Sequence, residues 1–117
     1  METNMRNGLA LLIAAVAGAS CAPIQSATAI SRAEEELRTA QFAHADEWAP
    51  YEYTKADLYL KMAKERQGFS DFEAAKEFAE EAQRLASTSK DSATQNLRLK
   101  QRREGPAPLK PVPEGGR

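Results

Sequence analysis

Apolar side chains recur every three or four residues through most of the chain, in three stretches separated by short breaks. The first stretch runs from about Ser31 to Asp46, the second from about Pro50 to Gln67, and the third from Ser70 to about Arg102. This period is typical of amphipathic helices, whereas no stretch alternates apolar and polar residues as a half-buried strand does. The pattern therefore predicts three helices and no sheet.

The residues at the breaks support these boundaries. Ser31 and Ser70 each stand three positions before a glutamate, which is the spacing of a capping box at a helix N-terminus. Pro50 suits a first helical turn, and it ends the preceding helix because the residue before a proline is pushed out of the α region. Gly68 suits a C-terminal cap. Because short connections make neighbouring helices antiparallel, we expect an all-α fold, an up-down-up bundle of three helices.

Alanine dominates the predicted inner faces of these helices. In the third helix the inner stripe is Phe72, Ala75, Ala79, Ala82 and Ala86, and it continues in phase through Ala93 and Leu97. In the first two helices it consists of Ile30, Ala33, Leu37, Ala40 and His44, and of Ala56, Tyr59, Leu60 and Ala63. Small side chains at so many inner positions let helix axes approach closely. From the extent of the three helical stretches, we expect the helical domain to span residues 28–103.

The first 20 residues differ in composition from the rest of the chain. Arg6 precedes the charge-free apolar run Leu9–Val16, and small residues then lead to Cys21. This is the three-part arrangement of a secretory signal peptide, and the apolar run is too short to span a membrane. We therefore expect residues 1–20 to be a cleaved signal peptide. A translation start at Met5 would fit this arrangement as well.

The residues around Cys21 resemble a bacterial lipobox, at which a lipoprotein signal peptidase cuts before a diacylated cysteine. Ala19-Ser20 matches the small residues of that pattern, whereas Gly18 stands where leucine is usual. The resemblance implies that Cys21 carries lipid, and several acyl chains on one residue anchor a protein stably. By resemblance to Gram-negative lipoproteins, Ala22 after the cysteine implies the periplasmic face of the outer membrane. Residues 21–27 would then form a short tether.

Two other outcomes are open at this point. Ala17-Gly18-Ala19 also fits the A-x-A rule of ordinary signal peptidase, which would release a soluble protein beginning at Ser20. An uncleaved N-terminal anchor is the third outcome. Because Cys21 is the only cysteine, it forms no internal disulfide, and its position directly after the apolar run favours lipidation.

The helical region also resembles known families. The spacing of small and aromatic residues from Ala56 through Gly68 to Ala82 is similar to one tetratricopeptide-type hairpin, although a repeat array needs about three copies. The wider run that starts at Trp48-Ala-Pro-Tyr51 resembles Gram-negative lipoproteins of the domain-of-unknown-function 4398 family, in which an Ala-Pro-x-x-Tyr/Leu motif precedes an alanine-rich hairpin. This resemblance covers about residues 28–100. It implies an envelope lipoprotein and brings no known catalytic or binding residue.

Charge is unevenly distributed, although the whole chain carries only −1. Residues 28–86 hold 13 acidic and 8 basic side chains, whereas residues 98–117 hold 6 basic and 2 acidic ones. The Pro/Gly-rich residues 104–117 predict a disordered tail. Its charge favours either simple solubility or contact with anionic lipid, peptidoglycan or an acidic protein. Nucleic-acid binding needs a basic folded surface, and the acidic helical region argues against it.

No pattern predicts catalysis, a cofactor or a metal. His44 is the only histidine, and a metal site usually needs several histidine or cysteine ligands. Consecutive glutamates such as Glu34–Glu36 diverge in direction on a helix, so we interpret them as a solvated face. The serines between Ser87 and Ser92 have no histidine base for a catalytic triad. We therefore expect no enzyme.

Four aromatic residues gather near the start of the second helix: Trp48, Tyr51, Tyr53 and Tyr59. As core side chains they need no further function, whereas a partly exposed aromatic patch would suit the binding of a protein segment. Two hypotheses follow. The chain is either a structural or scaffold lipoprotein of an envelope assembly, or a peptide- or cell-wall-binding module that uses the aromatic patch or the basic tail. The partner is then an unknown envelope protein or peptidoglycan.

Overall fold

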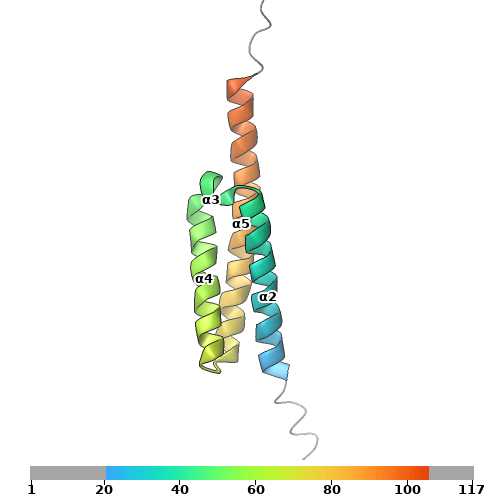
Figure 1. The fold of residues 1–117 in the computed structure, drawn as a ribbon, viewed down its shortest axis with the longest axis vertical. Helices are drawn as coiled ribbons and strands as arrows, with labels where there is room; N and C mark the ends of the chain where they lie inside the picture. Colours follow the sequence, from blue (N-terminus) through green and yellow to red (C-terminus); the bar gives the residue numbers. More distant parts are fainter. Residues whose placement is uncertain (1–20, 106–117) are drawn as a thin grey trace, which may run out of the picture.

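The computed structural model describes residues 21–105, and all regular secondary structure in that range is helical. The elements are α2 (Cys21–Phe42), α3 (Ala45–Trp48), α4 (Pro50–Gly68) and α5 (Phe72–Glu104). Figure 1 shows α2, α4 and α5 side by side, with α4 running opposite to the other two and α3 as a short link at one end. The predicted all-α fold is confirmed. The predicted signal peptide and the tail beyond residue 105 lie outside the described residues.

The first helix already includes Cys21, the first described residue, so the predicted start near Ser31 was wrong. Pro23 fits the first turn of a helix, because its missing N–H would have no partner there. Ser26 is fully buried, and its hydroxyl donates a hydrogen bond to the carbonyl of Pro23 at 3.0 Å. Ser31 therefore lies inside the helix, and the predicted capping box does not mark its start.

The break between α2 and α4 lies at His44, whose backbone φ is 57°. This left-handed conformation ends α2 at Phe42, earlier than the predicted Asp46, and turns the chain into α3. The N–H of His44 donates to the carbonyl of Gln41 at 2.9 Å, and its own carbonyl accepts from Trp48 at 3.0 Å. His44 is exposed, so its predicted place on the inner stripe was wrong, whereas its predicted place at a helix end is correct.

The turn between α4 and α5 uses Ser70, not Gly68, as its left-handed residue. Ser70 has a φ of 61°, whereas Gly68 is the last residue of α4. The N–H of Ser70 donates to Gln67 and the N–H of Asp71 donates to Arg66, both at 3.0 Å. These two bonds form a Schellman motif, which satisfies carbonyls at the end of α4. The predicted role of Gly68 was therefore wrong by two positions.

Asp71, rather than the predicted Ser70, caps the N-terminus of α5. Its carboxylate accepts a hydrogen bond from the N–H of Ala74 at 3.4 Å. Because Ser70 takes part in the preceding turn, it is not available for this role. Asp71 therefore serves both the end of α4 and the start of α5.

Alanine fills the interior of the bundle. Among the described residues, 12 of the 15 buried apolar side chains are alanine, and the others are Ile30, Leu60 and Leu85. In α5 six of the seven buried positions follow a seven-residue repeat with alternating steps of four and three, and Leu85 lies beside it: Ala75, Ala79, Ala82, Ala86, Ser89 and Ala93. We call this row the alanine seam. It confirms the predicted inner stripe of the third helix and packs against both α2 and α4.

The alanine seam predicts that an added side chain in α5 has no room. Ala79 is fully buried, in a cluster with Ile30 and Leu60. Ala79→Leu should therefore lower the free energy of unfolding by about 1–3 kcal/mol, measured by denaturation followed by circular dichroism. The neighbouring control Glu80→Gln changes an exposed side chain 3.9 Å from Lys76 and should cost less than about 0.5 kcal/mol. Equally small effects of both substitutions would contradict close packing of α5.

The position of the α4–α5 turn generates a second prediction. A Cβ atom added to Gly68 meets nothing within 4 Å, so Gly68→Ala should stabilise the chain by about 0.5–1 kcal/mol through helix propensity. Ser70→Gly should also stabilise it by a similar amount, because glycine adopts a positive φ without steric cost. Equilibrium denaturation of each single variant measures both effects. A loss of stability in Ser70→Gly would show that Ser70 is not the left-handed residue of the turn.

Candidate functional site

Cys21 is exposed and is the first residue of α2. The register of the two parallel helices places it along the bundle: Glu36 of α2 lies beside Lys90 of α5, and Ala40 packs with Ala93. Counting back by the same offset, Cys21 is level with the first turn of α5. It therefore lies at the end of the bundle that carries the α4–α5 turn, as Figure 1 shows. A group attached to Cys21 would leave the bundle at this end.

The four predicted aromatic residues do not form one patch. Tyr59 packs in the middle of the bundle, with its ring centroid 5.9 Å from that of Phe78. Tyr51 is 71% exposed, and residues two positions apart on a helix, such as Tyr51 and Tyr53, point to nearly opposite sides. Trp48 and Tyr53 each pack against a separate cluster that consists of Ala40, Ala45, Ala49 and Ala93. The predicted patch is therefore divided among three environments.

Lys55 connects two of these aromatic residues along one flank of α4. Its ammonium group lies 5.9 Å from the centroid of the Tyr51 ring and 6.0 Å from that of the Tyr59 ring. A cation at this distance from a ring face is weakly attracted to it at an exposed site. The exposed ring of Tyr51 is thus held by a neighbour on its own helix.

Tyr53 differs from the other tyrosines in its electrostatic surroundings. Burial raises the pKa of its hydroxyl above the usual 10.0, and the carboxylates of Asp46 and Asp57 raise it further. The hydroxyl therefore stays protonated near neutral pH. It packs against the alanine cluster at the α3 end of the bundle, so it is a packing residue with a polar edge.

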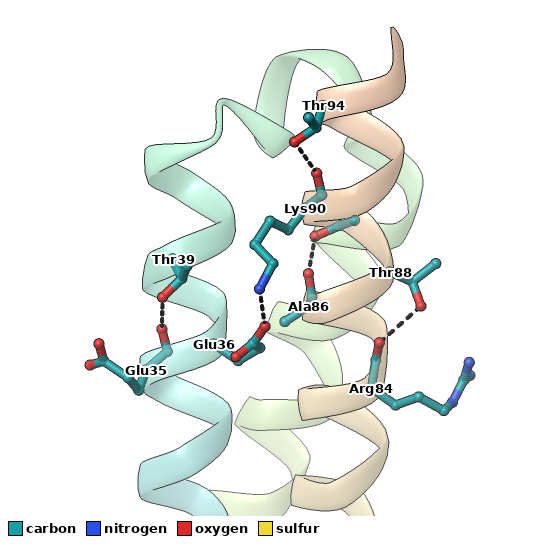
Figure 2. A network of polar contacts seen from close by, with 9 residues as sticks. Glu35, Glu36, Thr39, Arg84, Ala86, Thr88, Lys90 and Thr94 are labelled. Atoms are coloured by element: carbon teal, nitrogen blue, oxygen red, sulfur yellow. Dashed lines mark hydrogen bonds and ion pairs between the residues drawn. The ribbon is translucent and has the colours of Figure 1, made fainter. Parts of the chain in front are cut away.

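The run of three glutamates is divided between helix contacts and solvent. Glu36 reaches Lys90 of α5 at 2.6 Å, as Figure 2 shows, and Glu34 reaches Lys64 of α4 at 2.6 Å. Glu35 pairs only within its own helix. The interpretation of this run as a wholly solvated face was therefore wrong, because two of its members bridge α2 to the other long helices. These ion pairs lie beside the alanine seam, and each gives its glutamate a lysine partner on another helix.

Hydroxyl side chains of α2 and α5 bond to the backbone of their own helices. Figure 2 shows Thr39, Thr88 and Thr94 donating to the carbonyls four residues earlier, at 2.9–3.0 Å. The buried Ser89 donates to the carbonyl of Ala86 at 2.7 Å. These bonds let hydroxyl residues lie within a continuous helix, and α5 runs through the serine-rich residues 87–92 without a break.

A feature that the sequence analysis missed lies where α5 extends beyond α2. In the register set by Glu36 and Lys90, the last residue of α2 is level with about Asn96, and α5 continues to Glu104 (Figure 1). We call residues 96–104 the α5 tip. The phase of the seam could have indicated it, because Asn96, Lys100 and Arg103 occupy the seam positions that follow Ala93.

Trp48 lies against the α5 tip. The side-chain amide of Asn96 donates a hydrogen bond to the carbonyl of Trp48 at 2.7 Å. The ammonium group of Lys100 lies 5.0 Å from the centroid of the indole ring, within the range of a cation–π interaction. A shallow pocket at this junction is lined by Trp48, Asn96, Leu99, Lys100, Arg103 and Glu104. It combines apolar surface with cationic side chains.

Within residues 21–105, no group of three or more histidine, cysteine, aspartate or glutamate side chains is placed to hold a metal ion. In the same range no helix combines the length and the apolar character needed to cross a membrane. Comparison with protein-family models, with curated proteins and with solved structures finds no match to this chain. The resemblance to the 4398 family therefore stays a prediction.

The Glu36–Lys90 pair predicts how stability depends on pH. The hydrogen bond from Lys90 to Glu36 raises the pKa of the lysine above its usual 10.5, so the stabilisation is complete below that value and is lost as the pH rises through the raised pKa. Tyr53 contributes a loss in the same direction. The free energy of unfolding should therefore fall as the solution becomes more alkaline than these ordinary values.

Glu36→Gln isolates the contribution of the ion pair. At neutral pH the substitution should cost about 0.5–1 kcal/mol, since both side chains are partly shielded from solvent. In urea denaturation across the alkaline range, the variant should lose less stability than the unmodified chain, and Tyr53→Phe serves as the control for the tyrosine. Parallel pH profiles of Glu36→Gln and the unmodified chain would contradict the assignment.

Proposed function

We propose that this chain is a non-enzymatic lipoprotein of the cell envelope. Lipid on Cys21 anchors it to the periplasmic face of the outer membrane, and its helical bundle acts as a structural scaffold or protein-interaction module. The observation that carries this proposal is that Cys21 lies in α2, one of the three long helices of the bundle, and is exposed. Because Cys21 is part of that helix, a lipid there is joined directly to the bundle and its orientation is restricted.

The surroundings of Cys21 support an anchored end. Ile24, in the first turns of α2, is 66% exposed, and Phe69, in the α4–α5 turn, is 73% exposed. Both lie at the end of the bundle that carries Cys21 (Figure 1). Apolar side chains this exposed gain free energy when a bilayer interface covers them. The same end that would carry the lipid thus presents two further apolar groups to a membrane.

The opposite end supports an interaction role. From its first turn to its last residue, α5 spans about 45 Å at 1.5 Å per residue. A bundle that stands on the membrane at Cys21 holds the α5 tip at that distance from the lipid. The basic residues of the tip then face away from the anchoring membrane. This arrangement favours a partner in the periplasm over the headgroups of the same bilayer.

The contacts of polar side chains support a role without catalysis. Glu34 and Glu36 form ion pairs between helices, and Glu81 forms an ion pair within α5 with Arg84 at 2.5 Å. The hydrogen bond from Arg84 holds the pKa of Glu81 below its usual value. The Glu81 carboxylate is therefore poorly suited to donate a proton near neutral pH.

Lipidation of Cys21 is tested by the intact mass of the protein extracted from membranes. We expect acyl chains on a mature N-terminus at Cys21, and Cys21→Ala should move the protein to the soluble fraction. Ser20→Ala keeps a small residue before the cysteine and should behave as the unmodified chain does. A mature N-terminus at Ser20 with an unmodified thiol would contradict the anchor and favour ordinary secretion.

A further inference from the structure

We propose that the α5 tip and Trp48 form a docking site for an acidic peptide segment of a partner protein, one that carries an apolar side chain beside its carboxylates. This inference deepens the proposed interaction role and rests on it, but it does not depend on the lipid at Cys21. The site is the pocket lined by Trp48, Asn96, Leu99, Lys100, Arg103 and Glu104.

The site is held in place by the bundle although α5 has no neighbouring long helix there. Asn96 fixes the backbone of Trp48 with a hydrogen bond of 2.7 Å. Trp48 itself is half-buried against the cluster that contains Ala93, the last alanine of the seam. The indole is therefore oriented before any partner arrives, which reduces the entropy lost on binding.

The charge of the tip selects the chemistry of the partner. Residues 96–105 contain four basic side chains and one acidic one, whereas residues 21–95 contain 14 acidic and 9 basic ones. The basic side chains are Arg98, Lys100, Arg102 and Arg103. A second tip would be repelled by this charge, because it carries the same sign. An acidic segment is attracted, and the attraction speeds its encounter with the site.

Two side chains are placed to bind carboxylates of such a segment. Arg103 can bind a carboxylate in a bidentate manner, since its guanidinium presents donors in a planar fork. Lys100 has three donors, so it can pair with a carboxylate while its ammonium stays 5.0 Å from the Trp48 ring. Its contact with Glu104 is 3.8 Å long and exposed, and a partner's carboxylate would readily replace it.

Apolar surface at the same place selects a peptide rather than a simple anion. Leu99 is 42% exposed and lines the pocket together with the half-buried Trp48. An apolar side chain of the partner can rest between them while its carboxylates reach Lys100 and Arg103. The pocket lies beside Trp48, where α3 meets α5. The pocket therefore fits a peptide segment better than a lipid surface.

The test uses Trp48 as its own reporter, because it is the only tryptophan of the chain. The full chain, extracted in a mild zwitterionic detergent, is titrated with a short synthetic peptide of glutamates around a central pair of leucines. We expect a saturable change in the emission of Trp48. The same peptide with glutamine in place of glutamate, or serine in place of leucine, should bind about tenfold more weakly or not at all. Equal binding of either control peptide would overturn the proposal.

Variants of the protein locate the site. Lys100→Gln combined with Arg103→Gln should weaken binding of the acidic peptide about tenfold, and Leu99→Ser should weaken it as well. Arg66→Gln removes an exposed basic side chain at the other end of the bundle and should leave the affinity unchanged. All these side chains are exposed, so circular dichroism should show an unchanged fold. An equal loss of affinity in Arg66→Gln would overturn the location.

The other occupants are separate outcomes of the same assay. A change in Trp48 emission with phosphatidylglycerol in the micelles, but not with the peptide, would assign the tip to anionic lipid and overturn the proposal. A change with protein concentration alone would assign it to a second copy, with the same consequence. If the chain extracted from membranes carries no acyl group and still binds the peptide, the anchor is refuted and the docking site stands. If the chain is acylated and does not bind the peptide, the docking site is refuted and the anchor stands.

Discussion

Alanine lets two helix axes approach more closely than any larger apolar side chain does, and this close approach is the constraint on which the bundle depends. The seam of α5 repeats every seven residues, so one narrow stripe stays toward α2 and α4 along the length they share. Because alanine buries little area, the seam needs support at its edges. Tyr59 and Phe78 pack beside it, and the Glu36–Lys90 pair bridges the helices that it joins. The ion pair therefore follows from the spacing that the alanines set.

The seam also determines where function is to be sought. It runs from the first turns of α5 to Ala93, and beyond that point the same phase carries Asn96, Lys100 and Arg103. The change from small apolar to polar and basic residues coincides with the end of α2 and with the position of Trp48. One end of the bundle thus carries Cys21 and exposed apolar groups, and the other carries a basic tip. An anchored scaffold that presents a docking site away from its membrane makes use of both ends.

The helices and the alanine stripe were predictable because they depend on the three- and four-residue spacing of apolar positions, which can be read from the sequence. The ends of the helices were not predictable, because several neighbouring residues could each cap a helix or adopt the left-handed conformation. Ser70 took the left-handed position that Gly68 suits better, and Asp71 took the cap. Residues 21–30 are helical, and there the buried Ser26 satisfies its hydroxyl on the carbonyl of Pro23. The aromatic residues were close in sequence but were separated by their directions around α4, and the α5 tip emerged only from the different lengths of two parallel helices.

Native-state hydrogen exchange along α5 tests the central claim most directly, because it measures the free energy of opening at each amide. If the alanine seam holds the bundle, amides from Ala79 to Ala93 should exchange only through global unfolding, with nearly equal opening free energies. Amides of the α5 tip beyond Lys100, which have no neighbouring long helix, should exchange at much lower free energies. Uniformly low protection along the whole of α5 would contradict the account, because the helix would then not be held by its seam.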